Sequence, residues 1–175
     1  MTVPFEVFGP YDIDRKEVFE AKWQKDGWAG VDEEVGQKLS EAAGVYVFSL
    51  RHGETYLPLY VGSTTQQGFR KEVFNKSNLV KIAHDWAHLN GAISLHLLTK
   101  RKKIQKGFSK SINADWINSL EVLLIFLCRR RNPNLANKKH TVWLDGIGIR
   151  GITTLAKNKG KPLNAVSTLK AVIGW

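Results

Sequence analysis

The alternation of apolar and polar positions predicts three strands in the first two thirds of the chain. Residues 44–50 (GVYVFSL) and 56–62 (YLPLYVG) are rich in β-branched and aromatic side chains, and the glycine-containing RHGE between them predicts an antiparallel hairpin. Pro58 lacks a backbone donor, so we expect it near a sheet edge or a bulge. The run 92–99 (AISLHLLT) predicts the third strand.

The remaining chain is predicted to contain six helices. The first two helices are each expected to begin at an aspartate, Asp14 or Asp32, because a carboxylate can accept the free N–H groups of a first turn. The longest helix is expected to be capped by Asn113. The last one is expected to cover the core or to form a dimer contact. The predicted helices span 14–24, 32–42, 68–75, 78–90, 113–130 and 164–175.

These elements predict an α/β (α+β) fold with a small, mainly antiparallel three-stranded sheet flanked by helices. At 175 residues and 43% apolar content, the chain can bury one good core. The single cysteine, Cys128, lies in an apolar run and is expected to be a buried hydrophobe. The N-terminus does not resemble a signal peptide and no apolar run is long enough for a membrane span, so we expect a soluble, cytoplasmic protein without a membrane partner.

The net charge of +10 is unevenly distributed along the chain. Residues 1–43 hold ten acidic and five basic side chains, a balance of −5, and the remainder therefore carries +15. Two runs without acids hold much of this positive charge: Lys100, Arg101, Lys102, Lys103, Lys106 and Lys110 in the first, and Arg129, Arg130, Arg131, Lys138 and Lys139 in the second. Such clusters attract polyphosphate, so nucleic acid is the expected partner. A solvated basic surface is the alternative.

Glu121 is the most informative residue of the longest predicted helix. It falls on a stripe of apolar residues at helical spacing, formed by Ile117, Leu120, Leu124 and Cys128. A carboxylate in such surroundings needs a cationic partner, a proton or a metal ion. A hard divalent cation such as Mg²⁺ (or Mn²⁺) would satisfy it, and so would the dipole of the helix or a basic neighbour.

The order of five sequence elements resembles that of the GIY-YIG nuclease family. GVY ends at Tyr46, YVG begins at Tyr60, Arg70 follows on a predicted helix, Glu121 lies on a later buried helix, and an asparagine at 134 or 137 follows a proline. The resemblance implies a nuclease domain over 43–138, an acidic helical N-terminal extension over 1–42, and a C-terminal extension over 139–175 packed on the same domain. The family includes excision-repair, homing and restriction endonucleases.

This resemblance implies a role for each motif residue. Glu121 would hold the metal, Arg70 would bind the scissile phosphate, and Tyr46 would be the general base that activates water. A tyrosine of ordinary pKa is a poor base near neutral pH, so that role requires a perturbed site. Tyr60 would position the water or the phosphate. Asn137, or Asn134, would hold a tyrosine or the glutamate's helix in register.

Three departures from the family pattern affect the expected site, and one of them is the C-terminal motif around Pro133, where spacing favours Asn137 without excluding Asn134. Phe74 stands where many relatives carry a tyrosine or histidine, and it can neither accept a proton nor bind a phosphate. His84 and His88 could approach the site, although we expect two surface histidines. The third departure is a long basic insertion, residues 100–111 (KRKKIQKGFSKS), which precedes the glutamate helix and where we expect contacts with the DNA backbone.

The expected function is therefore a Mg²⁺-dependent endonuclease on double-stranded DNA. The first alternative is a catalytically inactive nucleic-acid-binding module, favoured by Phe74. The second is a nuclease acting on RNA, which would use the same residues. A homodimer is a further possibility, because symmetric double-strand cleavage usually needs two copies of a single-site enzyme.

Overall fold

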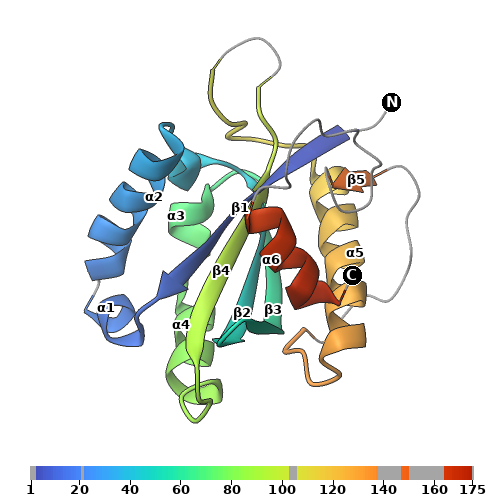
Figure 1. Ribbon diagram of the computed structural model, residues 1–175. Coiled ribbons are helices and arrows are strands. Elements are labelled where there is room, and N and C mark those ends of the chain that lie inside the picture. The colour runs from blue at the N-terminus through green and yellow to red at the C-terminus, as the bar shows by residue number, and fades with distance from the viewer. Residues whose placement is uncertain (1–2, 21, 103–105, 138–146, 150–163, 175) are drawn as a thin grey trace.

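The computed structural model describes residues 3–20, 22–102, 106–137, 147–149 and 164–174 (Figure 1). Four antiparallel strands form the body of one sheet, and a short fifth strand joins its edge in parallel. Their order in space is β3-β2-β4-β1-β5. The strands are β1 (Val3–Ile13), β2 (Gly44–His52), β3 (Thr55–Thr64), β4 (Ala92–Thr99) and β5 (Ile147–Ile149).

The prediction of three strands is wrong because β1 adds a fourth antiparallel strand to the sheet. It lies within residues 1–42, which were expected to be helical, and it pairs with β4. Phe5 and Val7 join one core whereas Tyr11 and Ile13 join the other. The register shifts between Phe8 and Tyr11, and this irregularity breaks the period-two pattern by which a strand is recognised.

The hairpin of β2 and β3 is confirmed, as is β4. β3 is an edge strand of the sheet, and its pairing with β2 shifts register between Phe48 and Ser49, next to Pro58. Pro58 therefore lies both at an edge and at an irregularity, where its missing N–H removes no regular ladder bond.

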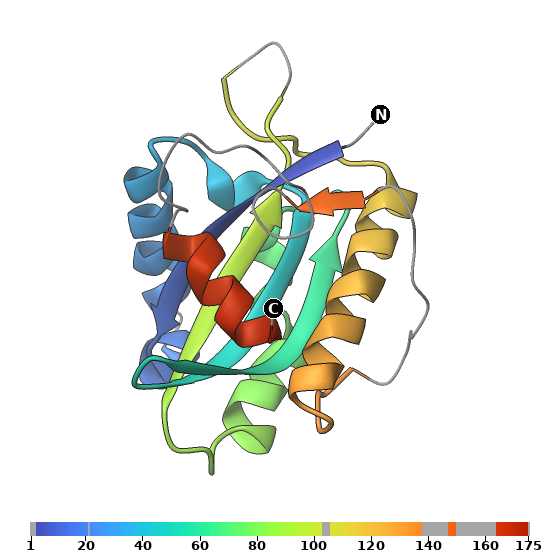
Figure 2. The same cartoon turned by 45° about the vertical axis from the view of Figure 1, so that its right-hand side comes forward.

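Helices cover both faces of the sheet (Figures 1 and 2). On one face the apolar core includes side chains of α5 and α6, and on the other it includes those of the helices that precede β4. Buried side chains of α6 join the first core, so this helix covers the core, as one of its two predicted roles required. The α-helices are α1 (Arg15–Phe19), α2 (Trp28–Val35), α3 (Phe69–Glu72), α4 (Lys76–Val80), α5 (Ala114–Arg131) and α6 (Asn164–Ile173). Shorter turns are π-helical at η1 (Trp23–Gly27) and η3 (Lys81–Asp85), and 3-10 at η2 (Leu39–Glu41).

The predicted caps hold for two helices and fail for one. Asp14 accepts the Lys16 N–H at 2.7 Å and Asn113 accepts the Asp115 N–H at 2.7 Å, so both are N-caps. Asp32 lies inside α2, which begins earlier, at Trp28. Its buried carboxylate instead accepts the backbone N–H and the hydroxyl of Ser40, which ties α2 to η2.

Candidate functional site

Tyr46 of β2 is fully buried and its hydroxyl has a defined partner. Asn78 donates to the Tyr46 Oη from its Nδ2 at 2.8 Å, and the same amide donates to the Val73 carbonyl at 3.0 Å. The ring of Tyr46 packs against Tyr60 with centroids 6.2 Å apart. The structure therefore brings the two motif tyrosines together on one face of the hairpin.

Besides burial, the charges of two carboxylates, Glu72 and Glu121, raise the pKa values of both tyrosines. Burial raises the pKa of Tyr46, and the nearby Tyr60, Glu72 and Glu121 raise it further, against the hydrogen bond from Asn78. Burial, Glu121 and Glu72, in that order, also raise the pKa of Tyr60. The pKa of Glu72 is itself raised by burial and by Glu121, while a hydrogen bond from Asn75 opposes the rise. Tyr46, Tyr60, Glu72 and Glu121 thus form one electrostatically coupled cluster.

Glu121 lies on α5 between the predicted apolar neighbours. Ile117, Leu120, Leu124 and Cys128 are all fully buried, which confirms the stripe and the expected burial of the cysteine. The glutamate itself is half-buried, and its Oε2 accepts a hydrogen bond from the Ser63 hydroxyl at 2.7 Å. Ser63 directly follows the YVG motif, so this bond attaches the glutamate helix to β3.

Lys81 extends the polar cluster beyond Asn78. Its ammonium donates to Asn78 Oδ1 at 3.2 Å and to Ser77 Oγ at 2.9 Å, and it lies 4.5 Å from the centre of the Tyr60 ring. Burial lowers the pKa of Lys81, and the charge of Asp85 opposes this. Because the ammonium binds the amide oxygen of Asn78, the amide nitrogen is the end that faces Tyr46.

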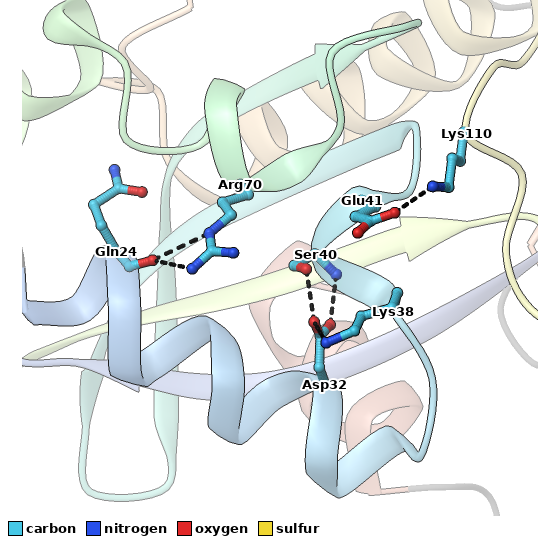
Figure 3. A network of polar contacts seen from close by, with 7 residues as sticks. All are labelled: Gln24, Asp32, Lys38, Ser40, Glu41, Arg70 and Lys110. Carbon is cyan, nitrogen blue, oxygen red and sulfur yellow. Dashed lines mark hydrogen bonds and ion pairs between the residues drawn. The ribbon is translucent and has the colours of Figure 1, made fainter.

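Arg70 of α3 is exposed and binds the N-terminal segment. Its Nε and Nη2 donate to the backbone carbonyl of Gln24 at 3.2 and 2.9 Å (Figure 3). Gln24 belongs to η1, in which the backbone of Gly27 lies close to the Trp23 side chain. A Cβ at position 27 would lie 2.5 Å from the Trp23 ring. An arginine carries further N–H donors that can bind a phosphate while this carbonyl remains in place.

The two candidate asparagines have different environments. Asn137 accepts the Val61 N–H at 2.8 Å and donates to the Val61 carbonyl at 2.7 Å, so its side chain pairs with the edge strand as a backbone would. Asn134 is exposed. The adjacent residues reinforce the docking, because the Asn132 side chain donates to the Pro58 carbonyl at 2.6 Å and the Ala136 N–H to that of Leu59 at 3.0 Å. Asn137 is the asparagine that holds the YVG segment.

Phe74 is part of the aromatic core. It is 3% exposed and packs edge-to-face against Trp23, with centroids 4.8 Å apart, and against Trp28 at 6.3 Å. The predicted exposure of His84 and His88 is confirmed.

The two basic clusters lie at opposite ends of α5. The insertion precedes its first residue, Ala114, and Arg129, Arg130 and Arg131 are exposed in its last turn, about 27 Å away for a helix of this length. Arg101 has internal partners: it donates to Glu6 Oε2 at 2.7 Å and to Gln37 Oε1 at 3.3 Å. Lys103, Lys138 and Lys139 lie outside the described residues.

Four residues in or beside the cluster of tyrosines and carboxylates were not predicted from the sequence: Ser63, Glu72, Asn78 and Lys81. Ser63 follows the YVG motif directly and Glu72 lies two residues after Arg70. Their positions next to motif residues could have indicated that they lie at the site. Asn78 is 1% exposed, but a single asparagine on a predicted helix is typical of a solvated face.

The comparisons with known proteins return no match to a family model, to a curated sequence or to a solved structure at a significant level. Within the described ranges, no helix has the length and apolar character needed to cross a membrane.

Proposed function

We propose that the protein is a metal-dependent endonuclease that hydrolyses phosphodiester bonds of DNA. The observation that carries the proposal is the cluster of Tyr46, Tyr60, Glu72 and Glu121, in which two phenols and two carboxylates from four elements influence one another's ionisation. Coupled, perturbed titratable groups are typical of functional sites. The order of the motifs around this cluster supports the same reaction.

The carboxylates suit a single Mg²⁺ or Mn²⁺. Among the described residues there is no group of three or more histidine, cysteine, aspartate or glutamate side chains that could enclose a metal. Mg²⁺ does not need such a group, because it keeps several waters and is held by one or two carboxylates together with substrate phosphate. Glu121, with Glu72 nearby, would hold it, and the cation would neutralise both the scissile phosphate and part of the negative charge that raises the tyrosine pKa values.

The protein side chains would divide the remaining work. Tyr46, in its phenolate form, would accept the proton of the attacking water, and its oxygen is held for this by Asn78, whose own orientation is fixed by Lys81. Tyr60 would position the water or the phosphate. Arg70 would bind the phosphate oxygens, for which a planar guanidinium is better suited than an ammonium.

The pKa of Tyr46 is the main obstacle to this assignment. Burial moves it upward, away from the value that a base at neutral pH requires. This observation favours a second candidate, a nucleic-acid-binding module without catalytic activity, which would keep the basic clusters and the fold. A nuclease on RNA would differ only in its substrate.

Cleavage assays distinguish these functions. Purified protein would be incubated with supercoiled plasmid and with single- and double-stranded RNA, with Mg²⁺ or with chelator. The endonuclease predicts metal-dependent nicking of the plasmid that is lost in Glu121→Gln and in Arg70→Lys. The control is Glu54→Gln, which makes the same charge change in the exposed hairpin turn.

Cleavage of RNA alone would change the assigned substrate from DNA to RNA. Salt-sensitive DNA binding without cutting, in every metal tested, would overturn the enzyme and leave the binding module.

A further inference from the structure

A cavity of about 490 Å³ lies between η2 and the basic insertion, outside the cluster of tyrosines and carboxylates. Its charged lining is strongly one-sided. The side chains that line it include Lys38, Lys102, Lys106, Lys110, Glu41 and Phe108. Four ammonium groups and one carboxylate around a small volume create a positive potential, which attracts anions.

The backbone of the insertion is folded back on itself where it forms this wall. Arg101 and Phe108 form an antiparallel bridge, and the Lys102 N–H donates to the Gly107 carbonyl at 3.0 Å. The Arg101 guanidinium also lies over the Phe108 ring, 5.1 Å from its centre. Lys102, Lys106 and Lys110 therefore each lie within two residues of this bridge.

Two of the four lysines bind oxygens of the protein itself (Figure 3). Lys110 forms an ion pair with Glu41, and both side chains are largely exposed. Lys38 lies 3.4 Å from Asp32, whose carboxylate is buried and already accepts two hydrogen bonds from Ser40. Asp32 thus has a structural role without the lysine, whereas Glu41 has Lys110 as its charged partner and lines the cavity itself.

The segments that line the cavity are attached by backbone hydrogen bonds to the strands and the helix that carry the candidate site. The insertion is attached to the start of β2 by the Ala43 N–H, which donates to Ser109 at 2.9 Å, and to the end of β3 by the Ile112 N–H, which donates to Thr65 at 3.3 Å. The Phe69 N–H at the start of α3 donates to Ala42, next to η2, at 3.0 Å. Tyr46 is only two residues into β2, about 7 Å along the strand.

We propose that this cavity binds a backbone phosphate of the DNA strand beside the site of cleavage. In the absence of DNA, Glu41 forms an ion pair with Lys110, and the phosphate displaces the Glu41 carboxylate when it binds. The identity of the ligand as nucleic acid rests on the proposed function. A phosphodiester offers the lysines what Glu41 now offers Lys110, an anionic oxygen at hydrogen-bond distance. The exposed pair can open at little cost, because such ion pairs are weak in water.

The test is a binding measurement on the full-length protein that does not depend on cleavage. Fluorescence anisotropy of a short labelled duplex would be followed in chelator over a series of salt concentrations. The variants are Glu41→Gln, Lys110→Gln, the double variant and Lys38→Gln. The ion pair of Glu17 and Lys22, at 2.7 Å and with comparable exposure, supplies matched controls in Glu17→Gln and Lys22→Gln, near α1 at the other end of the molecule (Figure 1).

The removal of Glu41's charge should strengthen binding. We expect Glu41→Gln to bind roughly two- to fivefold more tightly, the scale of one exposed ion pair. Lys110→Gln and Lys38→Gln should each weaken binding and reduce the slope of log K against log salt by about 0.9. In the double variant the gain from Glu41→Gln should vanish. The proposal is overturned if Glu17→Gln strengthens binding as much as Glu41→Gln, or if the gain survives without Lys110.

Two further measurements separate the possible failures. If the variants behave as expected but no nucleic acid is cut with metal, the phosphate site stands and the endonuclease fails. If wild-type protein cuts plasmid but the Glu41 and lysine variants bind like their controls, the endonuclease stands and this site is wrong. Pyrophosphate is the small-anion probe: if it binds and no duplex does, the ligand is not nucleic acid.

Discussion

The ring of Tyr46 lies directly against the backbone of Gly62, on the neighbouring strand. These residues are register partners in the β2–β3 pair, and a Cβ at position 62 would lie 2.3 Å from both Oη and Cζ of the tyrosine. The absence of a side chain at this position is therefore what lets the phenol reach across the edge strand, as expected for a glycine that permits close approach.

Gly62→Ala should consequently displace the tyrosine. The methyl group cannot be accommodated without a shift of the ring, so we expect a loss of about 1–3 kcal/mol in the free energy of unfolding. If the protein is the proposed endonuclease, misplacement of Tyr46 by about 1 Å should also lower plasmid nicking by roughly a hundredfold. Urea unfolding and nicking rates check both values. The control is Gly30→Ala, at a position in α2 with nothing within 4 Å of the added Cβ, which should nick at the wild-type rate.

Tyr46→Phe separates packing from chemistry. The Asn78 amide loses one acceptor but still donates to the Val73 carbonyl, so the cost in unfolding free energy should be near 1 kcal/mol. If the hydroxyl is the general base, nicking should fall by roughly 10²–10⁴. Tyr56→Phe, a buried tyrosine in the other core, is the matched control. Nicking by Tyr46→Phe within a few-fold of wild type would exclude the hydroxyl as the base.

The apolar pattern predicted the elements that are dense in apolar residues between clear turn signals. The hairpin, β4, α5 and α6 are of this kind, and each was found. The strand β1 was missed because its register shifts between Phe8 and Tyr11, which disguises a strand. Asn78 and Lys81 were missed for a different reason: a polar residue on a short helix has the same sequence signature whether it faces solvent or a buried hydroxyl. Only the contacts of Asn78 with Tyr46 and of Lys81 with the Tyr60 ring decide between these.

Lys81 should act by orienting Asn78. Lys81→Arg keeps a cation and several donors near the amide oxygen, so nicking should stay within about tenfold of wild type. Lys81→Met keeps the apolar stem but removes the donor, which frees the amide to rotate, and nicking should fall further. Plasmid assays compare the two, with the exposed Lys76→Met of α4 as control. A complete loss in both Lys81 variants, with unchanged folding, would instead assign proton transfer to the lysine.

Asn137 should contribute to stability through its bonds to the edge strand. Asn137→Ala removes the partners of both the N–H and the carbonyl of Val61, a buried residue, so we expect a loss of about 1–3 kcal/mol in the free energy of unfolding. Asn134→Ala, at the exposed neighbouring asparagine, should change it by less than about 0.5 kcal/mol. Equal effects in urea unfolding would contradict the pairing of Asn137 with β3.

His96 should make stability depend on pH below neutrality. It is fully buried on β4, its Nε2 lies 2.9 Å from the Thr168 hydroxyl of α6, and burial lowers its pKa to about 3. The unfolded chain binds a proton near pH 6.5 whereas the folded chain does not, so this histidine disfavours folding progressively as the pH falls from 6.5 towards 3. Over that window the free energy of unfolding should fall by about 1.4 kcal/mol per pH unit from this group.

The variant His96→Gln tests this dependence through a slope, which is independent of its own effect on stability. Urea unfolding between pH 5 and 7 should show a pH dependence weaker by the contribution of one histidine, whatever the absolute free energy. His84→Gln makes the same substitution at an exposed position of η3 and is the matched control. An unchanged slope in His96→Gln would mean that the buried imidazole accepts a proton within the fold, next to α6.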